Sequence, residues 1–436
     1  MRLFRCRIEM LTLAFAAMGG AAAGEGTITA DAVAVAEVQS GRRTEAVASW
    51  WGFDSDDATE SLQAAIDSGA RTVIVPYLGR PWIVRPIRLR SELELLFEPG
   101  VLVLAKAGEF RGRNDSLFTA IDAHDIVLRG YGATLRMRKA DYASDAYEKA
   151  EWRMVLNLRG CERIEVTGLR IEGSGGDGIY LGATQQLPYC KDVVIRDVVC
   201  HDNYRQGISV IGAENLLIEN CVLSDTGGTA PRAGIDFEPN HAREKLVNCV
   251  MRHCTIAGNE GPGFLAYLKN LSQDTDPVSI RVENCLITSG NDTGIVVGAV
   301  GDNGPQGIIE FINCTIEGSR KGGARIYDKS ADHVRVRFVN CKWNEPHQET
   351  AAADAAGGTR LIHLRRPEIT RRQGGVEFVD CRVWDSLDRP GLLVEHPSET
   401  ETVDVTGTLT IHNPHRARMA LPATGADVAL SIDTGG

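Results

Sequence analysis

Two acidic side chains on one short segment carry the clearest acid–base chemistry in this sequence. Asp236 and Glu238 alternate with Ile235 and Phe237 in the run Gly-Ile-Asp-Phe-Glu. Because successive residues of a strand point to opposite faces, we expect the apolar pair to face a core and both carboxyl groups to face outward. Residues two apart along a strand lie about 6.6 Å apart, near the ~6.5–9.5 Å between an acid and a base with water between them. The spacing predicts an acid–base pair without assigning the two roles.

The elements that position this pair follow from an internal repeat. Gly178, Gly207 and Gly234 each stand before Ile and lie 29 and 27 residues apart, and Gly263, Gly294 and Gly323 continue the series. A fixed period in this range indicates stacked repeats. Each repeat has room for strand, turn, strand and turn, and its apolar face finds cover only by stacking on the next repeat. We expect the glycines to permit backbone angles that other residues resist.

A second column of the repeat holds cysteines. The chain has eleven Cys, and five of them follow Asn or Asp at one repeat position: Cys221, Cys285, Cys314, Cys341 and Cys381. We interpret these five as buried apolar side chains stacked in a ladder, with an occasional disulfide as the alternative. The sequence lacks the CxxC pairs or clustered His of a zinc site, so we expect no metal and no cofactor.

Stacking brings other polar residues near the acid pair, since neighbouring coils lie about 4.8 Å apart. Arg205 and Arg232 offer guanidinium groups suited to a carboxylate or sulfate, and Tyr180 falls in the column of Asp236 two coils away. Asp177 is expected nearby but offset along its strand. Further candidates for substrate binding are Gln206, Asn240, Trp152, Arg153 and Tyr267.

Each candidate also has a structural explanation. Asp236 and Glu238 could form a surface ion network with the two arginines. Asp177 beside glycine suits a turn. A polar excursion at 139–151 is too long for a coil turn, so we expect it to protrude, either to bind a ligand or as a surface helical insertion. Trp152 and Arg153, which follow it, could simply anchor it.

The remaining sequence divides into expected regions. Residues 1–23 combine basic, apolar and small segments, as in a secretory signal peptide, and the rest contains no run of ~18 apolar residues able to span a membrane. We assign 45–80 to an N-terminal cap with a helix near 58–66, 81–412 to the repeat body and 413–436 to a tail. The net charge of −11 argues against a nucleic-acid partner.

The capping segment followed by coils with Asn-Cys and Asp-Gly-Ile steps resembles the right-handed parallel β-helix proteins of the pectate-lyase-like superfamily. The resemblance covers about residues 45–385 and implies an all-β, right-handed parallel β-helix with an N-terminal capping helix. It further implies a secreted or periplasmic protein that acts on a polysaccharide or oligosaccharide. Of the polygalacturonase motif positions only Asp177 matches; Arg205-Gln206 replaces the Asp pair and Arg232-Ala233 replaces the Gly-His step.

These observations support hydrolysis of a polysaccharide by the carboxyl groups of Asp236, Glu238 and Asp177. A first alternative is a polysaccharide lyase, in which Arg205 or Arg232 neutralises a uronate while a Tyr or His removes a proton. A second alternative is a non-catalytic carbohydrate-binding protein. The sugar, the linkage and the oligomeric state stay open at this stage.

Overall fold

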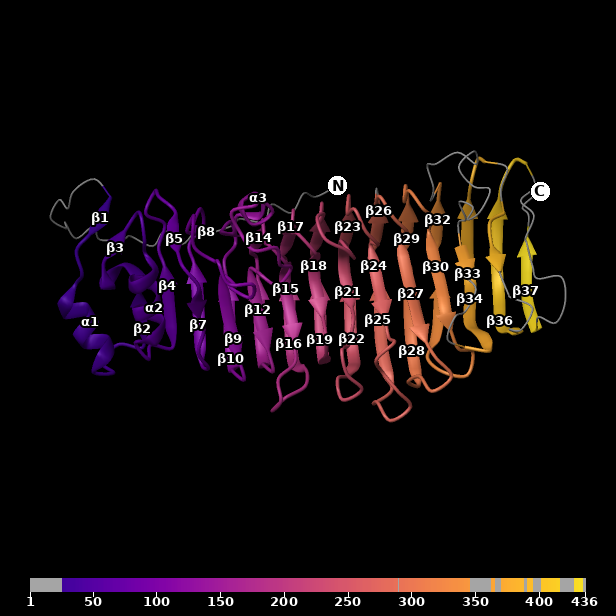
Figure 1. Cartoon of the computed structure of the whole chain (residues 1–436), viewed down its shortest axis with the longest axis horizontal. Coiled ribbons are helices and arrows are strands. Elements are labelled where there is room, and N and C mark those ends of the chain that lie inside the picture. The colour runs from indigo at the N-terminus through magenta and orange to yellow at the C-terminus, as the bar shows by residue number, and fades with distance from the viewer. Residues whose placement is uncertain are drawn as a thin grey trace, which may run out of the picture.

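Parallel strands in register build the whole body of the chain. The computed structural model describes residues 26–288, 290–345, 362–364, 370–387, 390–394, 401–415 and 427–433. The coils stack along one long axis, with helices at the N-terminal end (Figure 1). The chain is a right-handed parallel β-helix, as the repeat and the resemblance predicted.

One wall of the helix is an 11-stranded parallel sheet, with one strand from each coil. In chain order its strands are β6 (Ile87–Arg88), β9 (Phe118–Ile121), β12 (Leu156–Arg159), β15 (Asp177–Gly182), β18 (Gln206–Val210), β21 (Ala233–Phe237), β24 (Phe264–Tyr267), β27 (Ile295–Val300), β30 (Ala324–Lys329), β33 (Ile362–Leu364) and β35 (Leu393–Val394).

The other walls form a 24-stranded sheet made of two parallel rows. The long-strand row contains β2 (Glu45–Val47), β4 (Thr72–Val75), β7 (Leu93–Phe97), β10 (His124–Arg129), β13 (Glu162–Thr167), β16 (Cys190–Arg196), β19 (Ala213–Glu219), β22 (Leu246–Arg252), β25 (Val278–Glu283), β28 (Gly307–Ile312), β31 (Arg335–Val339), β34 (Arg372–Trp384), β36 (Glu401–His412) and β37 (Asp427–Asp433). The short-strand row contains β5 (Trp82–Val84), β8 (Leu102–Ala105), β11 (Thr134–Arg136), β14 (Arg170–Glu172), β17 (Val199–His201), β20 (Val222–Ser224), β23 (Thr255–Ala257), β26 (Leu286–Thr288), β29 (Thr315–Glu317) and β32 (Lys342–Asn344).

The interior is filled by columns of identical or similar side chains. Phe264, Phe311, Phe338 and Phe378 follow one another with ring centroids 5.1, 5.1 and 5.5 Å apart. The expected cysteine ladder is confirmed: the ten cysteines in the described part of the chain are buried and free of disulfides. This continuous core supplies the apolar cover that a single coil lacks.

The residues before the cysteines make the turns. Asn284, Asn313 and Asn340 have positive φ angles of 52°, 54° and 50°, a region that Asn tolerates better than most residues. Their side chains form a ladder, in which Asn313 donates to Asn284 at 3.2 Å and Asn340 donates to Asn313 at 2.8 Å. The recurring Asn-Cys pair is therefore a turn residue followed by a core residue.

The glycines of the repeat serve a different purpose from the one expected. A Cβ on Gly178 would lie 2.6 Å from the Gly207 carbonyl oxygen, and a Cβ on Gly207 would lie 2.5 Å from that of Gly234. None of the three has the positive φ that would require glycine. They are needed because backbones of adjacent coils approach too closely for a side chain.

The N-terminal end is covered as predicted, with additions. Helix α2 (Thr59–Asp67) buries Leu62, Ala65 and Ile66 against the first coils. The sequence analysis did not anticipate α1 (Ala32–Gln39), the 3-10 helix η1 (Ala48–Trp51) or the antiparallel pair β1 (Thr27–Ile28) and β3 (Phe53–Asp54).

The region boundaries also differ from those expected. Parallel pairing already begins between β2 and β4, inside the range assigned to the cap, and β37 continues the stack into the range assigned to the tail. The expected signal segment 1–23 lies outside the described residues. In the parts of the chain that the structure describes, no helix is both long and apolar enough to cross a bilayer.

Candidate functional site

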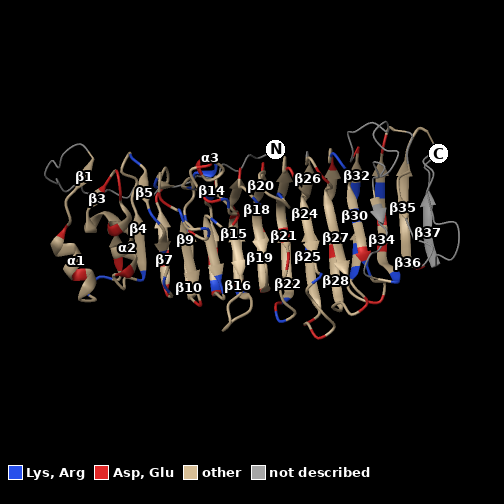
Figure 2. Cartoon of the chain, viewed as in Figure 1, with Lys and Arg blue, Asp and Glu red and all other residues tan. Residues whose placement is uncertain are grey.

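The register of the 11-stranded sheet assembles the site on the outer face of three coils. Tyr180, Ser209 and Asp236 are direct partners on β15, β18 and β21, which confirms the predicted column. Asp177 and Gln206 form the neighbouring column. Figure 2 shows charged residues interrupting otherwise uncharged strands near β21.

Asp236 faces away from the core but is completely covered by its neighbours. Its flanking residues Ile235 and Phe237 are buried in the core, as the alternation predicted. Its Oδ2 accepts a hydrogen bond of 2.7 Å from Nε2 of Gln206, and Oε1 of Gln206 in turn accepts from the N–H of Ala233 at 2.9 Å. These contacts fix the amide orientation and hold the carboxyl group in place.

The pKa of Asp236 is raised well above its usual range. Burial is the main cause, and the charge of Glu238 and a hydrogen bond with Glu238 raise the pKa further, against the opposing effect of Arg205. Oδ1 of Asp236 has no hydrogen-bond partner among the described residues. Burial and the charge of Glu238 therefore both favour the protonated form of Asp236.

Arg205 is the central cation of the site. Its NH2 lies 3.1 Å from Oε2 of Glu238, its NH1 lies 3.9 Å from Oδ1 of Asp177, and its Nε lies 3.8 Å from Oε2 of Glu151. The side chain is 16% exposed. One guanidinium thus faces several carboxyl groups, and only the contact with Glu238 is a hydrogen bond.

Asp177 is the least satisfied group in the site. It has no exposed surface, and in the described structure neither carboxyl oxygen accepts a hydrogen bond from a side chain. Burial raises the pKa of Asp177 to about 7; Arg205 opposes the rise, while Glu151 and Glu238 add to it. A neutral and a charged form of Asp177 are therefore close in free energy near neutral pH.

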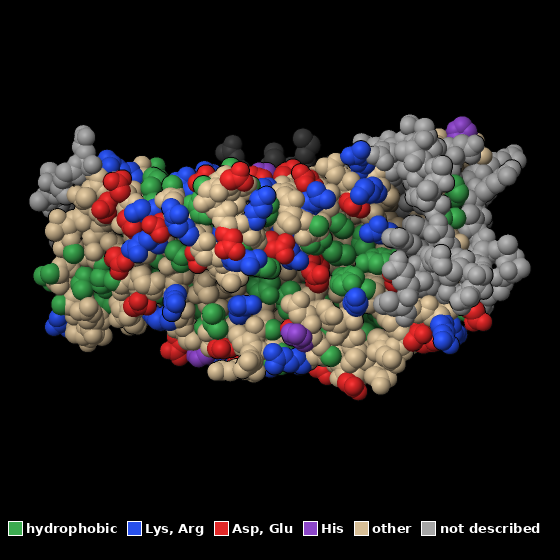
Figure 3. Space-filling view, in the orientation of Figure 1, with side chains coloured by type: hydrophobic (Ala, Val, Ile, Leu, Met, Phe, Trp, Pro, Cys, Tyr) green, Lys and Arg blue, Asp and Glu red, His purple; other side chains and the backbone are tan. Residues whose placement is uncertain are grey.

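Glu238 is more accessible than the two buried aspartates of the site. Its backbone N–H donates to the Val210 carbonyl and extends β21, and its side chain is 28% exposed. The next coil pairs Ala266 with Phe237, which places Tyr267 beside Glu238. Next to it lies a small cluster of buried apolar side chains, Ala233, Leu265 and Val296, with the partly buried Tyr267 and Tyr327 packed against it. Figure 3 shows acidic and basic side chains over the middle coils next to an apolar area.

The structure separates three other candidates from this site. Arg232 forms an ion pair of 3.1 Å with Glu260 on the following coil instead of contacting the acid pair. Asn240 closes a turn, where its N–H donates to Glu244 at 2.5 Å. Trp152 is partly exposed and lies under the guanidinium of Arg113, 4.9 Å from the ring centroid.

Arg153 holds the 139–151 segment instead of facing a ligand. It is fully buried, and its guanidinium donates to the carbonyls of Phe110 at 2.8 Å and Glu148 at 3.0 Å. It also packs against the rings of Tyr142 and Tyr147. In the structure Arg153 thus anchors this segment, and its expected role in substrate binding stays a prediction.

Glu151, which was not predicted from the sequence, reaches the site from the 139–151 segment. Helix α3 (Lys139–Tyr142) starts this segment, which folds back onto the coils instead of protruding (Figure 1). The hydroxyl of Thr229 donates to Oε2 of Glu151 at 3.3 Å. Because the segment interrupts the repeat, no period in the sequence could have placed Glu151. Among the described residues, no group of three or more His, Cys, Asp or Glu is arranged to hold a metal ion.

Comparisons with known proteins agree on the fold. Residues 156–343 match the family model described as a right-handed β-helix region. The uncharacterized protein YclG of Bacillus subtilis (strain 168) is 30% identical over 182 residues, which cover 39% of this chain and 31% of YclG. The chain spans less than a third of the length of the curated relatives that it matches.

Two solved structures have the same architecture at low identity. The catalytic unit of a thermostable GH87 α-1,3-glucanase from Streptomyces thermodiastaticus strain HF3-3 aligns with a TM-score of 0.58 and 14% identity, over 87% of this chain and 65% of the glucanase chain. The A-module of the mannuronan C-5 epimerase AlgE4 from Azotobacter vinelandii aligns with a TM-score of 0.52 and 14% identity, over 87% and 94% of the two chains. At this identity the likeness concerns the fold alone, and it joins proteins of different chemistry.

Proposed function

Taking as premise that the chain is a right-handed parallel β-helix protein, we propose that it hydrolyses glycosidic bonds of a polysaccharide on the outer face of its 11-stranded sheet. The observation that carries this proposal is the cluster of buried polar atoms that lack hydrogen-bond partners in the described protein. They include both carboxyl oxygens of Asp177, Oδ1 of Asp236 and Nε of Arg205. Native proteins leave few such groups, and those that remain are often functional.

Asp236 and Glu238 would supply the general acid, and Asp177 the general base. The raised pKa of Asp236 keeps its carboxyl group protonated beside the partly exposed Glu238, so this pair can protonate a leaving glycosidic oxygen. Asp177 lies across the Arg205 guanidinium from Glu238 and has a pKa of about 7, which suits a base that activates water near neutral pH.

The surroundings provide surfaces for sugar rings. The partly buried Tyr267 and Tyr327 follow Glu238 on one side along the long axis. Tyr180 lies on the other side, and the guanidinium of Arg159 is 5.7 Å from its ring centroid. The glucanase and the epimerase of the same fold are named for acting on a glucan and on mannuronan, and this supports a polysaccharide as substrate here.

The test is activity on a glycan panel that includes an α-1,3-glucan, a polygalacturonate and an alginate. We expect new reducing ends from at least one of them. Asp236→Asn and Glu238→Gln should each reduce that rate by roughly 10²-fold or more. Glu260→Gln is the matched control, because Glu260 pairs with Arg232 on the exposed surface of the same coils. Full activity in both site variants would reject the proposal.

One observation favours a second candidate, a non-catalytic carbohydrate-binding protein. Asp177 and Asp236 have no exposed surface, and catalysis needs contact with the substrate. Binding to a glycan of the panel with no product after long incubation would support this candidate. Products with the ultraviolet absorbance of an unsaturated uronate would instead identify β-elimination by a lyase.

A further inference from the structure

A second polar site lies on another wall of the same coils. A surface cavity of ≈ 580 Å³ opens over β8, β11, β14 and β17 and is walled on one side by the start of the 139–151 segment. Four cationic side chains line it, together with three acidic ones. The cationic residues are Arg136, Arg138, Lys139 and Arg170, and the acidic residues are Asp141, Glu172 and Asp202.

The contacts among these residues leave positive charge uncompensated. Lys139 is satisfied by Asp202 at 2.6 Å and by the Asn203 carbonyl at 3.2 Å. Arg136 and Arg170 both donate their Nε–H to the same carboxyl group, that of Glu172, which is 10% exposed. One carboxylate cannot neutralise two guanidiniums, and both arginines line the cavity with side chains more than 40% exposed.

A second group of two arginines sharing one glutamate provides a comparison for Arg136, Arg170 and Glu172. Arg196 and Arg252 donate to Glu219 at 2.7 and 2.6 Å on β16, β19 and β22, with exposures close to those of Arg136 and Arg170. That trio stands on the long-strand row, away from α3. At the cavity, α3 adds a wall and the neighbouring Arg138 and Lys139 add charge.

We propose that this cavity binds the carboxylate or sulfate group of an acidic sugar. A guanidinium fork pairs well with either oxyanion. The turns from β14 to β15 and from β17 to β18 lead directly from the cavity to Asp177 and Arg205. The 139–151 segment also joins the two places, since Lys139 lines the cavity and Glu151 reaches Arg205. The identity of the ligand as a sugar rests on the proposed function, whereas the binding of an oxyanion does not.

The test is binding to the whole chain, measured by titration calorimetry at low salt with inorganic sulfate, an oligoglucuronate and a neutral glucose oligosaccharide of equal length. We expect the oligoglucuronate to bind and the neutral sugar not to bind at this site. The Arg136→Gln/Arg170→Gln double variant should weaken the affinity at least about tenfold. The Arg196→Gln/Arg252→Gln control should leave it within about twofold.

A second variant keeps the cationic side chains of the cavity and fills part of its volume. Ala140 is exposed at the cavity wall, so Ala140→Trp should block binding with little effect on folding, checked by circular dichroism. Stronger binding of sulfate than of the oligoglucuronate would identify a sulfate ester as the ligand group. Equal losses in the cavity and control doubles, or full binding by Ala140→Trp, would overturn the proposal. Asp236→Asn should lose activity but keep oxyanion binding, so the two proposals fail separately.

Discussion

Two buried ionisable side chains give opposite pH dependences that can be measured separately. The pKa of Asp177 is raised to about 7, mainly by burial, and the pKa of Lys329 is lowered to about 7, again mainly by burial. The free energy of unfolding rises with pH wherever the unfolded chain binds more protons than the folded chain. Each residue therefore makes its own prediction.

Asp177 should make the protein less stable as the pH rises from about 4 to 7. In that window the folded state holds a proton on Asp177 that the unfolded chain has released. We expect Asp177→Asn to reduce this decline and to be more stable than the parent at pH 8, by on the order of 2 kcal/mol. Urea unfolding at several pH values measures the slope, and an unchanged slope would contradict the pKa and with it the proposed base.

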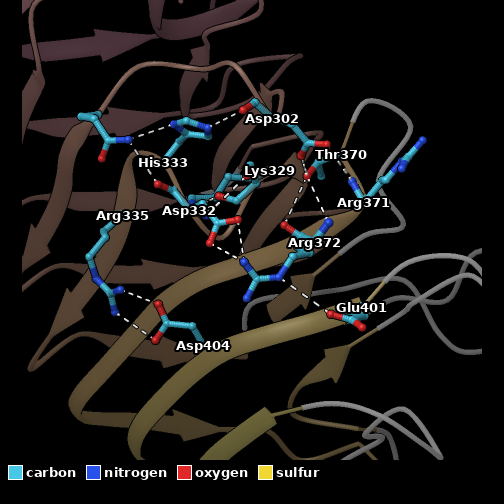
Figure 4. Close-up of polar contacts among 12 residues, drawn as sticks. Asp302, Lys329, Asp332, His333, Arg335, Thr370, Arg371, Arg372, Glu401 and Asp404 are labelled. Atoms are coloured by element: carbon cyan, nitrogen blue, oxygen red, sulfur yellow. Dashed lines mark hydrogen bonds and ion pairs between the residues drawn. The ribbon is translucent and has the colours of Figure 1, made fainter. Parts of the chain in front are cut away.

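Lys329 should act in the opposite direction between pH 7 and about 10.5. Its Nζ donates to the carbonyls of Ser330 at 2.8 Å and Gly374 at 2.7 Å, beside the ion pair of Arg335 and Asp404 (Figure 4). The unfolded chain is protonated in that window while the folded chain is not, so stability should rise with pH. Lys329→Met should flatten the rise, whereas the exposed Lys342→Met should not.

At this scale the sequence predicted which way side chains point but not what covers them. The alternation in 234–238 placed Asp236 outward and Ile235 inward, since both follow from strand geometry alone. It could not show that Asp236 would be completely buried or that Gln206 would hydrogen-bond to it. Those outcomes depend on side-chain conformations and on Glu151, which comes from a segment outside the repeat.

At the scale of elements, the 139–151 segment is held by one buried cation. Arg153 donates to backbone carbonyls, and losing it would leave these acceptors unpaired. We expect Arg153→Ala to destabilise the protein by roughly 3 kcal/mol, measured by thermal or urea unfolding. Arg113→Ala is the control, because Arg113 is about half exposed. Equal costs for the two variants would show that the segment does not depend on this anchor.

The elements themselves were predictable where they repeat. Helix α2 and strand β4 lie where their apolar patterns placed them. Helix α1 was missed because its run of alternating Ala and Val has little amphipathic character. The glycine columns were identified correctly, but their cause is the approach of neighbouring backbones, which only the stacked coils make visible.

For the whole molecule, the stacking of coils predicts that a core substitution destabilises only the coils next to it. Phe311 lies between Phe264 and Phe338 in the aromatic column. Phe311→Ala should cost roughly 3–5 kcal/mol through the cavity that it leaves. Because each coil contacts only its neighbours, hydrogen exchange should rise in the coils around β28 and stay unchanged near α2. Faster exchange along the entire chain would contradict this picture.

The outward-facing side chains of the 11-stranded sheet are also spaced regularly along the long axis of the molecule. Each coil advances about 4.8 Å along the long axis. A linear polysaccharide lying on that face would therefore contact residues of one coil after another, from Tyr180 past Glu238 to Tyr327. Duplicating one complete coil between β24 and β27 would move Tyr327 about 4.8 Å further from Glu238 along the long axis. It would leave the acidic residues of the site intact. The preferred product length should then grow while the chemistry stays the same.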